Sequence, residues 1–127
     1  MKMFIKVQTK DAPQAIGPYS QAIEMGELVF ISGQIPLTPG GELVDGGIEK
    51  QTHQVMKNVQ GILHAAGSDL NHVVKTTIFL KDFDHFQQVN EIYGQYFSEH
   101  QPARSCVEVS RLPKEVLIEI EVIARKK

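Results

Sequence analysis

The pattern of apolar and polar side chains along the chain predicts six β-strands. Period-two patterns are typical of a strand with one buried face. The segment 70–80 is instead almost continuously apolar or β-branched, which favours a central strand covered on both faces. Gly26 and Glu27 separate two strands by only two residues, as in a tight hairpin. Residues 3–9, 103–109 and 116–124 show the alternation, and residues 21–25 and 28–31 are the two short strands of the hairpin.

Two further segments show the spacing of amphipathic helices. In residues 48–66, apolar side chains recur every three or four positions, and Gly67 follows as a C-terminal cap. A second helix is predicted after Asp84, a favourable N-cap residue, with aromatic side chains from Phe86 to Phe97 on its buried side.

The order β-β-β-α-β-α-β-β predicts an α+β fold, with one mixed sheet and both helices on one of its faces. Two helices cannot cover both faces of such a sheet. If the second face is apolar, another subunit must bury it, so we expect an oligomer.

Composition indicates an ordinary globular chain, most simply a single domain over residues 1–127. Hydrophobic residues make up 42% and charged residues 22%, and the net charge is −2. This charge does not favour nucleic acid or an anionic membrane as a partner. The single cysteine cannot form an intrachain disulfide, and the longest wholly apolar run covers only residues 28–31. We therefore expect a cytoplasmic protein without a membrane span.

The strand predicted at 103–109 carries a candidate for ligand binding. Arg104 and Cys106 share one of its faces, and the planar guanidinium of Arg104 matches a carboxylate or phosphate. A pair with a surface acid is the alternative role. The short turn before 116–124 favours an antiparallel hairpin, which would bring Glu119 or Glu121 near the Arg104 end. Periodicity does not choose between these two glutamates.

Three other positions offer polar groups to a ligand. Pro18 fixes the backbone before Tyr19, whose hydroxyl can donate or accept, although a core tyrosine fits the same pattern. Ser32-Gly33 ends a strand and either exposes backbone N–H groups or forms a plain turn. Asn90 borders the apolar stripe of the second helix, where a bond to neighbouring backbone is the simplest role.

Motifs of several functional classes are missing. The chain has no phosphate-binding glycine loop, and its five histidines show no metal-ligand spacing, so we predict neither a nucleotide site nor a metal site. Basic residues are not interleaved with aromatic ones, which argues against RNA as a partner. Cys106 and a histidine could form a nucleophilic pair, but any chain with one cysteine and five histidines meets that test.

Sequence blocks spread over nearly the whole chain carry a family likeness. They are Ala-Ile-Gly-Pro-Tyr-Ser-Gln at 15–21, Ser-Gly-Gln-Ile-Pro at 32–36, Val-Lys-Thr-Thr at 74–77, Val-Asn at 89–90, Pro-Ala-Arg-Ser-Cys-Val-Glu-Val at 102–109 and Arg-Leu-Pro-Lys at 111–114. In these blocks the chain resembles the Rid (YjgF) family of reactive intermediate deaminases. The resemblance implies a chorismate-mutase-like fold and a homotrimer with a central barrel and ligand clefts between subunits.

The same resemblance implies an activity without a cofactor. Members hydrolyse 2-imino acids such as 2-iminobutanoate and 2-iminopropanoate to 2-keto acids and ammonia. These imines arise from 2-aminocrotonate and 2-aminoacrylate, reactive enamines released by pyridoxal-phosphate enzymes. By the resemblance, Arg104 binds the carboxylate, Glu119 positions the attacking water and Tyr19 lies in the cleft. An imine carbon is already electrophilic, so this chemistry requires no metal.

The remaining matched residues have supporting roles. Ser32 and Gly33 match a backbone contact to the ligand, Cys106 a cleft residue that contributes shape, and Asn90 a polar residue near the cleft. Ser110 departs from the alanine of many members. A rival interpretation keeps the same cleft but makes the protein a small-carboxylate-binding regulatory or chaperone-like module, because fold does not fix function.

Overall fold

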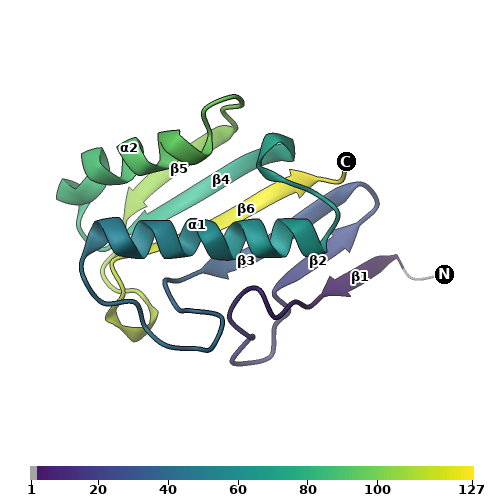
Figure 1. Ribbon diagram of the computed structural model, residues 1–127, viewed down its shortest axis with the longest axis horizontal. Coiled ribbons are helices and arrows are strands. Elements are labelled where there is room, and N and C mark those ends of the chain that lie inside the picture. Colours follow the sequence, from purple (N-terminus) through teal and green to yellow (C-terminus); the bar gives the residue numbers. More distant parts are fainter. Residues whose placement is uncertain (1–2) are drawn as a thin grey trace.

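The computed structural model describes residues 3–127 and arranges them as a six-stranded sheet with two helices (Figure 1). Both helices, α1 (Ile48–Ala65) and α2 (Phe86–Tyr96), lie on the same face of the sheet. This is the predicted α+β architecture. The strands are β1 (Phe4–Val7), β2 (Ala22–Met25), β3 (Leu28–Gln34), β4 (Val73–Leu80), β5 (Ala103–Glu108) and β6 (Ile118–Arg125).

The helix termini confirm one predicted cap and correct the other. Gly67 has φ 74°, and the N–H of Ser68 donates to the carbonyl of Leu63 at 2.8 Å, which closes the end of α1. Asp84 does not cap α2, because a short 3-10 turn over Phe83–His85 precedes that helix. Asp82 caps this turn by accepting from the N–H of Asp84 at 2.9 Å.

The sheet order is β1-β2-β3-β6-β4-β5, so the predicted hairpin of β5 with β6 is wrong. β5 pairs in parallel with β4, and α2 lies in the connection between these two strands. β6 lies between β3 and β4 and is antiparallel to both. Burial explains this arrangement. Alternate side chains of β6, from Ile118 to Ala124, are almost fully buried, whereas most of β5 is exposed and suits an edge. The short connection between β5 and β6 predicted a hairpin, but β6, the more deeply buried strand, lies inside the sheet and β5 lies at its edge.

The core lies between the helices and one face of the sheet. Val55, Val59 and Ile62 of α1 are fully buried, as are Ile78 of β4 and Ile118 of β6. The tight β2–β3 hairpin forms as predicted, with Met25 opposite Leu28.

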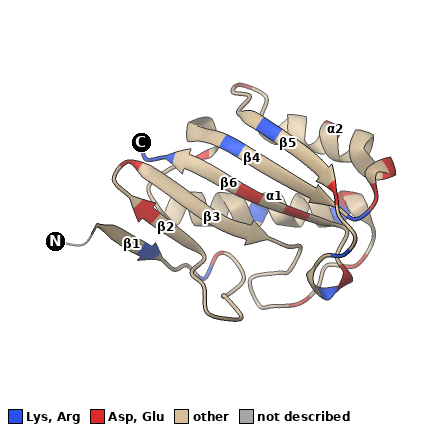
Figure 2. Cartoon of the chain, turned by 180° about the vertical axis from the view of Figure 1, so that it is seen from behind, with Lys and Arg blue, Asp and Glu red and all other residues tan. Residues whose placement is uncertain are grey.

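The second face of the sheet has no cover from residues 3–127, as Figure 2 shows from behind. Phe30 is 37% exposed, Val107 43% and Val74 48%. The prediction that the segment 70–80 is covered on both faces is therefore not met inside one chain. No helix within residues 3–127 has the length and apolar character needed to cross a membrane.

Candidate functional site

A cleft of about 660 Å³ brings together four of the residues singled out from the sequence. We name it the Glu119 cleft. Tyr19, Ser32, Gly33 and Glu119 all line it, although they come from three separate parts of the chain. The remaining lining residues are Ile16, Ile35, Pro113, Lys114 and Glu121.

A β-bulge shapes the floor of this cleft. Ile31 pairs with Val122 and Gln34 pairs with Ile120, so β3 contains one more residue than β6 over this stretch. Bulges redirect side chains and recur next to active sites. The strand predicted over 28–31 ends before the bulge, whereas in the structure the strand continues through Ser32-Gly33 to Gln34.

Gly33 leaves space that the Glu119 side chain occupies. A Cβ at this position would lie 1.9 Å from Oε2 of Glu119, so no other residue fits without moving the carboxyl. Ser32 is fixed beside it, because its hydroxyl donates to the carbonyl of Ser20 at 2.6 Å. The pair is therefore part of β3 and not a plain turn. The expected exposure of backbone N–H groups is not met at Ser32, whose N–H donates to the carbonyl of Gln21 at 3.0 Å.

Glu119 has the electrostatic environment of an acid–base group. It is half-buried, and burial raises the pKa of its carboxyl, with a further increase from the neighbouring Glu121 carboxylate. Glu121 lines the same cleft but is exposed. A raised carboxyl pKa in a cleft is a common feature of catalytic sites. Geometry thus favours Glu119 over Glu121, a choice that periodicity left open.

Tyr19 faces the cleft and is not a core residue, because it is 53% exposed. Its backbone N–H donates to the carbonyl of Gly17 at 2.8 Å, which holds the turn that presents the ring. Its hydroxyl accepts from the N–H of Ile16 at 3.4 Å. The hydroxyl proton remains available to a ligand.

Arg104 lies in a different cluster, at the edge where β5 meets α2. Its Nη1 donates to Oδ1 of Asn90 at 2.7 Å, and its guanidinium carbon lies 4.9 Å from the centre of the Tyr93 ring. Among the described residues no acidic side chain pairs with Arg104. The simpler roles expected of Arg104 and Asn90, a surface ion pair and a bond to backbone, are therefore wrong. We name Arg104, Asn90, Tyr93 and the nearby Phe86 the Arg104 cluster.

Cys106 follows Arg104 on the same face of β5 and is half-buried. Burial raises the pKa of its thiol, and the positive charge of Arg104 opposes this increase only in part. Cys106 therefore stays protonated at neutral pH and lacks the thiolate that a nucleophilic cysteine needs.

The two groups of candidate residues lie on opposite faces of the sheet. Arg104 is in register with Thr76, which points to the helices, whereas Glu119 is in register with Phe79 on the uncovered face. The expectation that a glutamate lies near Arg104 within one chain is therefore wrong. It depended on the hairpin of β5 with β6, which does not form.

Sequence reasoning gave no role to four cleft residues, Ile16, Ile35, Pro113 and Lys114. All four belong to blocks of the family likeness, at 15–21, 32–36 and 111–114, so the signal was present without an assigned function. The structure shows that Pro113 and Lys114 line the cleft.

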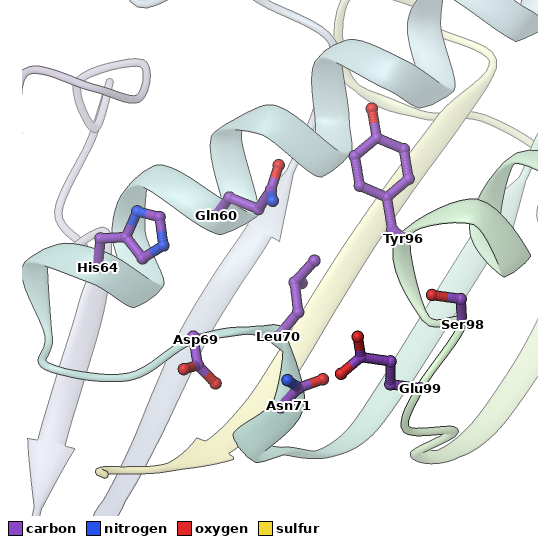
Figure 3. Close-up of a pocket in the computed structure, with 8 residues that line it drawn as sticks. All are labelled: Gln60, His64, Asp69, Leu70, Asn71, Tyr96, Ser98 and Glu99. Atoms are coloured by element: carbon purple, nitrogen blue, oxygen red, sulfur yellow. The ribbon is translucent and has the colours of Figure 1, made fainter.

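A second hollow, of about 270 Å³, lies near the C-terminal ends of α1 and α2 (Figure 3). It contains none of the predicted site residues. Two of its polar groups already have partners: Asp69 bonds to His72 at 2.6 Å, and the Tyr96 hydroxyl to His53 at 2.7 Å. The Glu119 cleft is therefore the better candidate. Within residues 3–127, no three His, Cys, Asp or Glu side chains gather in a way that could hold a metal ion.

Comparisons with known proteins agree with this fold. The family model described as Endoribonuclease L-PSP matches residues 9–126. A RutC family protein of Pyrococcus horikoshii is 58% identical over 119 residues, which cover 93% of this chain and 94% of the relative. A protein of Salmonella typhimurium named 2-iminobutanoate/2-iminopropanoate deaminase is 49% identical over 121 residues, with 93% and 94% covered.

A solved structure shows the same likeness in three dimensions. It is a protein of unknown function of the conserved Rid protein family from Yersinia pestis, with a TM-score of 0.94 and 52% identity. The match covers 96% of this chain and 98% of the other. The agreement of sequence, fold and family model over nearly the whole chain leads to one assignment: this chain belongs to the YjgF/Rid family.

Proposed function

We propose that this protein hydrolyses 2-imino acids, such as 2-iminopropanoate and 2-iminobutanoate, to 2-keto acids and ammonia. The observation that carries the proposal is the half-buried Glu119 carboxyl, with its raised pKa, held against Gly33 in the Glu119 cleft. The name of the Salmonella relative is consistent with the same reaction.

The Arg104 cluster provides the group that binds the substrate carboxylate. Asn90 orients the guanidinium by accepting a hydrogen bond from its Nη1, and the guanidinium carbon lies over the Tyr93 ring. The remaining N–H donors can bind a carboxylate through two parallel hydrogen bonds. Such a contact fixes the position of the adjacent C=N carbon.

Glu119 and Tyr19 provide the groups that act on the imine. The Glu119 carboxylate accepts a proton as a water molecule adds to the C=N carbon, forming a C–O bond and moving the C=N π electrons to nitrogen. Glu119 then passes this proton to the nitrogen of the resulting carbinolamine. The C–N bond breaks with release of ammonia, and the hydroxyl group loses its proton to become the keto oxygen. The Tyr19 hydroxyl can hydrogen-bond the departing nitrogen.

The two groups must come from different subunits, because Arg104 and Glu119 lie on opposite faces of one sheet. We propose a homotrimer in which the uncovered sheet faces surround a central barrel. Each site then combines the Arg104 cluster of one subunit with the Glu119 cleft of the next. The exposed apolar side chains of the uncovered face, among them Phe30 and Val107, support such burial.

Ammonia release from 2-aminoacrylate tests this proposal, with the enamine generated in situ by a serine dehydratase. The protein should accelerate ammonia release above the spontaneous rate. If it binds 2-ketobutyrate without accelerating the reaction, the regulatory or chaperone-like module is the correct interpretation. RNA is a weaker candidate ligand, because the two carboxylates of the cleft repel a phosphate backbone.

A further inference from the structure

The Glu119 cleft has an unfavourable charge for the substrate proposed above. Glu119 and Glu121 both line it, and a 2-imino acid carries a carboxylate of the same sign. Of the nine residues that line the cleft, all within the described part of the chain, Lys114 is the only cation. An anionic substrate therefore meets one positive charge among the groups of this subunit.

Lys114 is held at the cleft by an unusual backbone. It has φ 56° and the following Glu115 has φ 58°, so two consecutive non-glycine residues are left-handed. L-residues adopt this conformation at an energetic cost. Neighbouring contacts hold the loop: the N–H of the fully buried Val116 donates to the carbonyl of Pro113 at 3.2 Å. Strained backbone of this kind concentrates at functional sites.

The ammonium of Lys114 is also free of partners. Among residues 3–127 it forms no ion pair, although Arg111 and Glu115 beside it pair with each other at 3.5 Å. Neither carboxylate of the cleft pairs with it. A cation that lines an acidic cleft, in a strained loop and without a partner, is available to an incoming anion.

We propose that Lys114 is a specificity-determining residue that attracts the carboxylate of the substrate into the Glu119 cleft. The inference rests on the proposed function, since it requires an anionic ligand at this site. Lys114 offsets the charges of Glu119 and Glu121 during substrate capture and takes no part in proton transfer. Its loss therefore changes KM and ligand affinity, whereas kcat stays the same.

The test compares Lys114→Gln, Lys114→Arg and Lys114→Glu with the parent protein. Calorimetry gives the Kd of 2-ketobutyrate, and ammonia release gives kcat and KM. Both are measured at about 10 mM and at about 1 M salt, because the screening length is roughly 30 Å at the lower concentration and roughly 3 Å at the higher. At low salt Lys114→Gln should raise Kd and KM roughly two- to fivefold, the range of an exposed ion pair. Lys114→Glu should raise them further, and Lys114→Arg should stay near the parent.

Two control variants make the result specific. Lys57→Gln removes the same charge from an exposed position on α1, outside the cleft, and should change nothing. Lys114→Gly removes the same charge, and glycine adopts the left-handed backbone without strain. It should therefore show the increase in Kd and KM expected for Lys114→Gln, and it provides that measurement if the glutamine variant folds poorly.

Different outcomes overturn the two proposals. If the parent binds 2-ketobutyrate but Lys114→Gln and Lys114→Gly bind it equally well at low salt, the role of Lys114 is refuted and the proposed function stands. A loss that persists at high salt, or one in kcat alone, also refutes the role in capture. If the parent neither binds keto acids nor releases ammonia, both proposals fail.

Discussion

At the residue scale, Arg104 shows how a charged side chain can be fixed in place without an opposite charge. Asn90 accepts one of its hydrogen bonds and the Tyr93 ring lies 4.9 Å away. Arg104 has no charged partner among residues 3–127, so a carboxylate ligand would be the first. The guanidinium is oriented before the ligand arrives, which reduces the entropic cost of binding.

Replacing Arg104 should separate ligand binding from stability. Arg104→Ala should keep its thermal unfolding midpoint but bind 2-ketobutyrate roughly ten- to hundredfold more weakly, because a charged hydrogen bond is lost. Arg104→Lys should recover only part of this affinity, since an ammonium lacks the planar fork. Calorimetric binding beside thermal unfolding tests both variants. Unchanged affinity in a folded Arg104→Ala protein would assign the residue to structure alone.

Glu119 should control both the rate and its pH dependence. Glu119→Gln keeps the size of the side chain but cannot accept the proton of water, so deaminase activity should fall about a hundredfold or more while ligand binding persists. Ammonia release measures the first effect and calorimetry the second. Near-normal turnover would contradict the assignment of Glu119.

The pH profile gives an independent test of the same residue. Only the ionised form is a base, so the activity of the parent should decline as pH falls, with a midpoint above the ordinary glutamate pKa, because burial and Glu121 raise it. Glu121→Gln removes the second cause, so this midpoint should move to lower pH but stay above the ordinary value. An unchanged profile in that variant would contradict coupling between the two carboxyls.

At the scale of elements, the bulge in β3 positions the Glu119 side chain of β6. The extra residue between Ile31 and Gln34 leaves Gly33 against the carboxyl of Glu119. A local irregularity in one strand thus determines where a functional group of its neighbour can lie. This relation also explains why a glycine is needed here even though its φ is not positive.

Gly33→Ala should therefore disturb the site more than the small volume of the added methyl group suggests. The added Cβ would lie 1.9 Å from Oε2 of Glu119, so the carboxyl must move. We expect at least a tenfold loss of deaminase activity, as for a misplaced catalytic group, and a destabilisation of about 1–3 kcal/mol, as for overpacking. Gly40→Ala, whose Cβ would approach nothing closer than 3.8 Å, is the matched control. Equal activity of the two variants would show that Glu119 tolerates displacement.

At the scale of the whole molecule, one chain provides both halves of the proposed site but cannot join them. The sheet separates the Arg104 cluster from the Glu119 cleft, and its second face remains open (Figure 2). The proposed trimer would solve both problems, because it would bury the open face and bring the two halves of the site together from neighbouring subunits.

Mixing two inactive variants tests this shared site. Arg104→Ala and Glu119→Gln chains, co-refolded in equal amounts, should regain about one quarter of the parent activity, since random assembly gives that fraction of sites both intact groups. Sedimentation should show a mass near three times that of the chain for each variant and for the mixture. Trimers that regain no activity would place both groups of each site in one subunit, and a stable monomer would refute the trimer.

Most of the fold could be predicted from the sequence, because its signals are local. Alternating or continuous apolar runs predicted the strands, helical spacing predicted α1, and Gly67 marked its end. Motifs assigned the family and proposed the site residues, since short blocks such as 102–109 retain their residue types wherever the chain places them. These features depend on neighbours within a few residues.

The relations between distant segments needed the tertiary structure. Which strand pairs with which depends on how much apolar surface each order buries, and this placed β6 in the centre and β5 at the edge against the short connection between them. The same order put Arg104 and Glu119 on opposite faces, brought Lys114 over the cleft and set Gly33 against Glu119. The sequence alone determined which groups are present, and only the packing of remote segments decided which of them meet, because that choice depends on the burial of the whole sheet.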